Sequence, residues 1–145
     1  MAAWVPIYQA DRVDITPKNL QEAIDTGSWR RRIAALRYVE KNALEIRVFP
    51  AYKNMMKSPH IQVRYWLARA LAVGRGDGSF QDLLFLLNDP HPNVVCQALY
   101  ALGKRGDKAV ISAVIDTIKT SDSWYVQRYG YNSIRKLGWQ QPAST

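Results

Sequence analysis

The sequence is poor in the residue types that carry most catalytic, redox and metal-binding chemistry. It has 1 cysteine and 2 histidines among 145 residues. A single cysteine cannot close an intramolecular disulfide bond, and a zinc site needs about four ligands. His60 and His91 lie a full repeat apart, and neither they nor Cys96 has the neighbours that metal binding or nucleophilic catalysis requires. We therefore predict no metal, no cofactor and no catalytic residue.

Long hydrophobic segments are missing as well. The run of aliphatic and phenyl side chains at residues 83–87 is far shorter than the roughly 20 residues of a membrane span. The first residues, Met-Ala-Ala-Trp-Val-Pro, lack the basic and apolar regions of a secretory signal. We expect a protein of the reducing cytoplasm without a membrane span.

Phosphate-binding and nucleophile motifs do not occur either. There is no Gly-x-Gly-x-x-Gly, Walker or Gly-x-Ser-x-Gly string. The glycine-rich stretch at residues 74–78 follows a predicted helix instead of a strand, and no Lys-Ser/Thr pair comes after it. We interpret this stretch as a turn between repeats.

What the chain does have is an ordinary globular composition, 48% hydrophobic and 22% charged, with a formal net charge of +8. Residues 1–75 hold 13 Lys/Arg and 6 Asp/Glu, whereas residues 76–145 hold 7 and 6. The excess of positive charge favours an anionic partner, such as nucleic acid, a lipid surface or an acidic protein. It says nothing about the fold.

The fold is indicated by internal repetition. Three segments align with one another: residues 61–71, 92–102 and 124–134. Their anchor residues Val63, Val94 and Val126 lie 31 and 32 residues apart, and a weaker copy at residues 29–39 has Arg31 at the anchor position. Apolar or small residues recur about 4, 7, 8 and 11 residues after each anchor, which is the stripe of an amphipathic helix.

A second helix is predicted ahead of each of these. The expected segments are residues 17–26, 43–57, 79–88 and 107–119. Pro50 should kink the second of them, and Pro17 suits a first helical turn. Gly106 and Gly138 should end the helices that contain Val94 and Val126, because glycine adopts the left-handed conformation at little steric cost.

A repeat of two antiparallel helices around a Pro/Asp turn is an α-solenoid unit. The third repeat shows the pattern most completely, at Asp89, Pro90, Val94, Ala98, Ala101, Leu102 and Gly106. This pattern resembles the HEAT-like repeats, in particular the short version first described in phycobilisome lyases.

The resemblance implies an all-α fold, a right-handed α-solenoid of about four HEAT-like helix pairs. We predict an N-terminal extension at 1–15, a single repeat domain at 16–139 and a tail at 140–145. The predicted repeats are 16–42, 43–75, 76–106 and 107–139.

Arginines fall into register when the repeats are aligned. Arg32 and Arg64 follow their anchors by one residue, and Arg37 and Arg69 by six. The resemblance places these helices on a concave face, where Glu40 is the one carboxylate that we assign to them. The candidate basic groove comprises Arg30, Arg32, Arg37, Arg64, Arg69 and Arg75.

Two interpretations of these arginines remain open. They form a groove for an acidic partner or a phosphate backbone. Alternatively, they bond turn carboxylates and helix ends between neighbouring repeats.

The last predicted helix presents aromatic side chains away from its apolar stripe. At about 100° per residue, Trp124, Tyr131 and Arg135 fall about 140–180° from Val126. A terminal repeat normally presents a polar cap, whereas aromatic residues with arginine are typical of an interface centre. The candidate docking residues are Trp124, Tyr125, Tyr131, Arg135, Trp139, Trp4 and Tyr8. Alternatively, the N-terminal segment or the tail folds over them.

We predict a non-catalytic protein–protein interaction adaptor or assembly subunit, with other protein subunits, acidic ones included, as partners. Solenoid ends that are not polar favour higher-order assembly and self-association, because one surface can meet a different surface on another molecule. Residues 124–139 are similar to short HEAT-like proteins that accompany bacterial redox and respiratory complexes, which implies association with such a complex. One alternative is a nucleic-acid-binding protein that uses the basic groove. Another is a phycobilin-lyase-like or glycosylase-like enzyme, which would need Cys96, His91 or Glu40 in a cleft.

Overall fold

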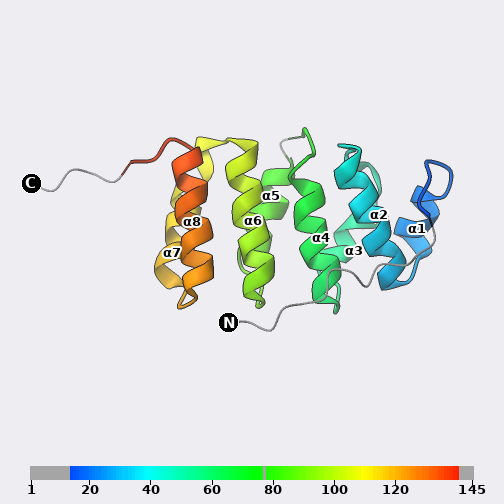
Figure 1. The fold of residues 1–145 in the computed structure, drawn as a ribbon, viewed down its shortest axis with the longest axis horizontal. Coiled ribbons are helices and arrows are strands. Elements are labelled where there is room, and N and C mark those ends of the chain that lie inside the picture. The colour runs from blue at the N-terminus through cyan, green and yellow to red at the C-terminus, as the bar shows by residue number, and fades with distance from the viewer. Residues whose placement is uncertain (1–13, 77, 141–145) are drawn as a thin grey trace, which may run out of the picture.

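Helices follow one another in pairs along the long axis of the molecule (Figure 1). The computed structural model describes residues 14–76 and 78–140. The α-helices are α1 (Leu20–Thr26), α2 (Trp29–Lys41), α3 (Tyr52–Met55), α4 (Ile61–Leu71), α5 (Gly78–Leu86), α6 (Pro92–Arg105), α7 (Ile111–Thr120) and α8 (Trp124–Lys136). Two 3₁₀ helices, η1 (Ile46–Val48) and η2 (Lys108–Val110), precede α3 and α7. The prediction of an all-α solenoid of about four helix pairs is confirmed.

The helices form two layers. Helices α2, α4, α6 and α8 stand side by side in front, and we call them the second-helix layer (Figure 1). Helices α1, α3, α5 and α7 lie behind them as the first-helix layer. Fully buried side chains such as Leu36, Leu67 and Leu99 come from successive helices of the front layer. Each helix pair therefore completes its core with its neighbours, as expected of a solenoid.

Small residues allow close packing of helices both between the last two repeats and within the last one. A Cβ atom on Gly103 of α6 would lie 2.9 Å from Ser133 Oγ of α8. A Cβ atom on Gly130 would lie 2.4 Å from Ile118 Cγ1 of α7. Both distances are shorter than an ordinary contact, so a larger residue at either glycine would push the helices apart.

The predicted helix ends at glycine are found in the structure. Gly106 caps α6 with φ of 81°, and Gly138, just after α8, has φ of 89°. Both values lie in the left-handed region, which non-glycine residues enter at a steric cost. These two glycines stop their helices and turn the chain onward.

The first predicted helix was wrong at its start. It begins at Leu20 rather than at Pro17. The Asn19 side chain accepts a hydrogen bond from the Thr16 backbone N–H at 2.7 Å, which closes a turn ahead of the helix. An asparagine side chain that bonds nearby backbone competes with helical pairing, so residues 17–19 stay in the turn.

The prediction of one kinked helix over residues 43–57 was also wrong. Phe49 is extended, with φ of −99° and ψ of 107°, between η1 and α3. It precedes Pro50, whose ring disfavours the helical conformation of the residue before it. Ala43 has a positive φ of 51°. The chain therefore makes two short helical turns where the sequence pattern predicted one helix.

Candidate functional site

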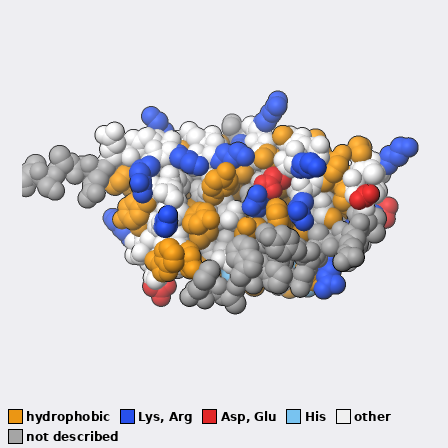
Figure 2. All heavy atoms as spheres, viewed as in Figure 1, with side chains coloured by type: hydrophobic (Ala, Val, Ile, Leu, Met, Phe, Trp, Pro, Cys, Tyr) orange, Lys and Arg blue, Asp and Glu red, His pale blue; other side chains and the backbone are white. Residues whose placement is uncertain are grey.

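Charge is separated between the two layers. Within their bounds, the four helices of the second-helix layer hold 12 Lys/Arg and 1 Asp/Glu. The four helices of the first-helix layer hold 2 Lys/Arg and 4 Asp/Glu. Blue side chains accordingly run along the whole length of the front face in Figure 2. The net positive charge of the protein is therefore concentrated on one face.

The distribution of charge in the fold differs from its distribution along the sequence. The C-terminal half is almost neutral in sequence, yet α8 carries Arg128, Arg135 and Lys136 and no carboxylate. Asp82 and Asp116, in contrast, lie on the first-helix layer. The basic face thus extends to the last helix.

Two arginines of the candidate basic groove are held inside the chain. Arg32 donates to the carbonyl oxygens of Ile24 and Asp25 at 2.9 and 3.0 Å. Arg64 forms an ion pair with Asp89 at 2.7 Å and donates to the Ser58 carbonyl oxygen at 2.6 Å. Arg32 thus satisfies carbonyl groups at the end of α1, and Arg64 bonds the turn before α4 and the turn carboxylate of Asp89. These are the contacts that the alternative, structural interpretation of the aligned arginines requires.

Arg37 and Arg69 flank one tryptophan. Their guanidinium carbons lie 5.1 and 4.8 Å from the ring centroid of Trp66, within the range of cation–π attraction. Arg69 also forms an ion pair with Glu40 at 3.0 Å, so the one carboxylate of the layer is already paired. Arg37 is exposed. The two arginines thus cover a buried aromatic ring, since Trp66 is 5% exposed, and of the two only Arg37 is fully at the surface.

The remaining two arginines of the candidate groove lie apart from this pair. Arg30 is exposed, and its guanidinium lies 4.9 Å from the ring centroid of Trp29. Arg75 is in the loop before α5, where its side chain is exposed. Its backbone N–H donates to Glu45 at 2.8 Å. The six predicted arginines therefore do not form one continuous cluster.

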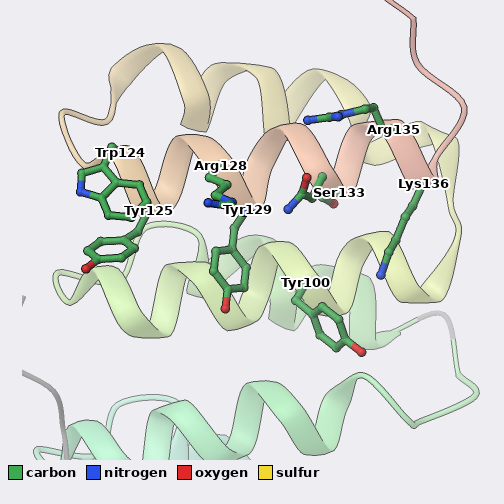
Figure 3. Close-up of a pocket in the computed structure, with 9 residues that line it drawn as sticks. Tyr100, Trp124, Tyr125, Arg128, Tyr129, Ser133, Arg135 and Lys136 are labelled. Carbon is green, nitrogen blue, oxygen red and sulfur yellow. The ribbon is translucent and has the colours of Figure 1, made fainter. Parts of the chain in front are cut away.

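A hollow of about 710 Å³ lies on the front face between α6 and α8 (Figure 3). It is lined by α8 side chains between Trp124 and Lys136 and by Tyr100 of α6, and we call it the α6–α8 groove. Tyr125, Tyr129 and Lys136 point from α8 toward α6 in Figure 3. Among the described residues, no carboxylate lines the groove.

The aromatic rings of the groove are arranged in contact with one another or with a cation. Trp124 and Tyr125 stack with centroids 3.9 Å apart, and Trp124 is 58% exposed. Lys136 Nζ lies 4.8 Å from the centroid of the Tyr100 ring. Burial is the main cause of a raised pKa for the Tyr129 hydroxyl, and electrostatic interaction with Cys96 and Tyr65 raises this pKa further. Tyr129 is therefore neutral at physiological pH and can donate a hydrogen bond.

Cys96 and His91, two of the side chains that the enzyme alternative would need, are inert or hydrogen-bonded. Burial raises the pKa of the Cys96 thiol to about 12, so the thiolate is rare at neutral pH. The His91 ring accepts a hydrogen bond from the Asn93 backbone N–H, and burial lowers its pKa. His60 stacks on Trp29 with centroids 4.7 Å apart. Within the described residues, no three His, Cys, Asp or Glu side chains gather as metal ligands.

A second hollow, of about 570 Å³, lies at the C-terminal end of the solenoid. We call this surface the end face; it is lined by Tyr131, Arg135, Gly138, Trp139 and Gln140. Tyr131 is 45% exposed. Arg135 points away from α6 in Figure 3. Tyr131 and Arg135 are exposed and therefore lie off the buried stripe of α8.

The end face differs from the surfaces between inner repeats. Leu99 and Gly103 of α6 occupy the positions that Tyr131 and Arg135 occupy in α8, and both α6 residues are buried. Tyr131 and Arg135 are instead exposed. The large side chains leave no room for a further repeat packed as α8 packs on α6.

The docking residues predicted from the sequence lie near both ends of the chain and do not include Tyr100, Arg128 or Lys136. The signal was present for Tyr100, since it follows its anchor by six residues, as Arg37 and Arg69 do. Trp4 and Tyr8, most of the predicted extension and most of the tail lie outside the described residues.

Comparison with known families gives one match. A family model of HEAT repeats matches residues 50–135. A search of curated proteins found no match to the chain. Across residues 14–76 and 78–140, every helix is too short or too polar to cross a membrane.

Proposed function

Because the chain belongs to the HEAT-repeat family, we propose that it is a non-catalytic protein–protein interaction adaptor. HEAT repeats generally mediate protein–protein interaction, and the family is typically non-catalytic. The adaptor holds an acidic partner protein against its second-helix layer. A second contact, through the end face, joins it to a larger assembly.

The observation that carries this proposal is the separation of charge between the layers. A face with 12 basic residues and 1 acidic residue on its helices attracts an acidic surface and disfavours a basic one. Such complementarity raises the rate of encounter and fixes which face is used. The exposed aromatic rings then supply the contact area, because aromatic side chains dominate the energetics of interfaces.

The non-catalytic part of the proposal is supported by the state of three side chains. Cys96 is 4% exposed, and its thiol is protonated at neutral pH because burial raises its pKa. His91 bonds the start of α6, and Glu40 is paired with Arg69. None of the three is free to act as the titratable group of a lyase or a glycosylase.

The proposal extends to the kind of assembly. The resemblance of residues 124–139 to proteins of redox and respiratory complexes points to a bacterial complex of that kind in the cytoplasm. The end face suits a heterologous contact, in which one surface meets a different surface and association can propagate.

The test is recovery of partners from the native host with tagged protein. We compare wild type with a double variant of the second-helix layer, Arg37→Glu with Arg128→Glu, and with a double variant of the first-helix layer, Lys53→Glu with Lys119→Glu. All four residues are exposed, so both variants should fold, which circular dichroism checks. We expect an acidic protein that wild type and the first-layer variant retain equally and that the second-layer variant retains about tenfold less.

Two results would overturn the adaptor proposal. Equal recovery with both variants would show that the basic face is not used. Loss of the recovered material after nuclease treatment would favour the nucleic-acid alternative, whose affinity also falls steeply with salt.

A further inference from the structure

We propose that the α6–α8 groove is the docking site for an acidic segment of the partner protein, with a large apolar side chain at one end of that segment. This inference rests on the adaptor proposal and assigns the partner's contact to one part of the second-helix layer.

One end of the groove is aromatic. Trp124 and Tyr125, at the start of α8, form a stacked pair of which the Trp124 side chain is 58% exposed. Tyr129 lies one turn further along α8, half-buried. Covering exposed rings of this size with an apolar side chain stabilises a complex, because apolar surface is removed from water. This end therefore fits a leucine, methionine or aromatic residue of the partner.

The other end of the groove is cationic. Lys136 projects over Tyr100, and Arg128 lies exposed between the two ends. The distance along α8 from Tyr125 to Lys136 is roughly 16 Å at a rise of 1.5 Å per residue. That length corresponds to about three turns of a helical segment. Carboxylates of such a segment, one to three turns from its apolar residue, would reach Arg128 and Lys136.

The ring faces favour a peptide over single-stranded nucleic acid. Proteins that bind single strands stack bases on open aromatic faces spaced along a groove. Here one face of Trp124 and one face of Tyr125 cover each other, with planes 27° apart. Lys136 lies over the Tyr100 ring. One face of each of these three rings is thus already covered, whereas Arg128 remains exposed to carboxylates.

The experiment uses photo-crosslinking in the native host. A benzoylphenylalanine replaces Tyr100, which lines the groove, or Tyr131, which lines the end face. The two positions are matched because Tyr100 is 44% exposed and Tyr131 is 45% exposed. After illumination, mass spectrometry identifies the partner peptide joined to each position. We expect the Tyr100 position to join a segment rich in Asp and Glu.

A charge reversal tests whether the cationic end recognises that segment. Lys136→Glu in the Tyr100-substituted protein should lower the yield of the adduct at least fivefold. Lys119→Glu, on the first-helix layer, should leave the yield unchanged. Both side chains are exposed, so we expect both variants to fold, and thermal unfolding checks this.

The outcomes separate this inference from the adaptor proposal. Adducts at Tyr131 alone would overturn the groove as the docking site and leave the adaptor standing. No protein adduct at either position, together with no partner in the recovery experiment, would overturn both. A nucleic-acid adduct at Tyr100, or a segment without acidic residues, would overturn the assigned chemistry of the partner.

Discussion

Individual arginines of the basic face have different roles, and Arg64 most clearly stabilises the fold. Its side chain is 12% exposed and its partner Asp89 is 4% exposed. Removing one member of a buried pair leaves the other charge uncompensated. We expect Arg64→Ala to lower the free energy of unfolding by about 3 kcal/mol, measured by chemical denaturation.

Arg75→Ala is the matched control. The Arg75 side chain is exposed, and only its backbone N–H bonds to Glu45. This variant should change stability by less than about 0.5 kcal/mol. Equal losses in the two variants would mean that the ion pair with Asp89 contributes nothing specific.

Cys96 gives a prediction about pH. Its pKa is raised from 9.0 to about 12 in the folded protein by burial, so the folded state disfavours the thiolate. The unfolded chain releases this proton first as pH rises. The free energy of unfolding that the protonated Cys96 thiol contributes is fully present below about pH 9 and is lost progressively between pH 9 and 12.

The comparison with Cys96→Ala isolates this effect. Between pH 7 and 10.5, wild type should lose about 1–2 kcal/mol more unfolding free energy than Cys96→Ala does. Denaturation at a series of pH values measures it. Parallel pH profiles for the two proteins would show that the thiol titrates normally in the folded state.

At the scale of elements, the loop ahead of α5 is tied down from both sides. Glu45 accepts hydrogen bonds from the backbone N–H groups of Arg75 and Gly76 at 2.8 and 3.4 Å. Arg105 of α6 donates to the carbonyl oxygens of Gly74 and Gly76. The glycine-rich loop thus already binds a carboxylate of its own chain, which agrees with its interpretation as a turn.

We expect Glu45→Ala to loosen this loop. The two N–H groups would lose their acceptor, at a cost of about 0.5–1.5 kcal/mol, because water can reach the exposed Arg75. Hydrogen–deuterium exchange should become faster at residues 74–76, whereas Glu22→Ala, on the exposed side of α1, should leave it unchanged. Unaltered exchange in the loop would show that Arg105 alone holds it.

Periodicity predicted some elements well and others poorly for identifiable reasons. Helices α4, α6 and α8 were found because their apolar stripes repeat at a fixed spacing. Residues 43–57 were mispredicted because local chemistry at Pro50 overrides the apolar pattern. The α6–α8 groove could not be read from the chain, because Tyr100 and Lys136 are 36 residues apart and meet only when the two helices stack. The pairing of Arg64 with Asp89 likewise depends on how repeats stack.

At the scale of the whole molecule, the two layers and the two ends give the protein different surfaces. The basic front face suits an acidic partner, whereas the end face is aromatic with a single arginine. Tyr131 and Arg135 replace the buried Leu99 and Gly103 of the inner repeat, so another copy cannot extend the array by the same packing. Contact at the end face therefore requires a surface of different shape.

The aromatic side chains of α8 lead to the last prediction, for Trp124→Ala, in the α6–α8 groove, combined with Tyr131→Ala, on the end face. Both side chains are about half exposed, at 58% and 45%, so their loss should leave the fold intact. Exposed aromatic residues at an interface centre each contribute about 2 kcal/mol or more to binding. We expect the double variant to lose at least about tenfold in recovery of a partner bound at either surface, or to lose higher-order oligomers in light scattering. Phe85→Ala, which removes an aromatic ring 49% exposed on α5, is the control. Unchanged partners and an unchanged oligomeric state, with the fold retained, would mean that the aromatic end is not an interface.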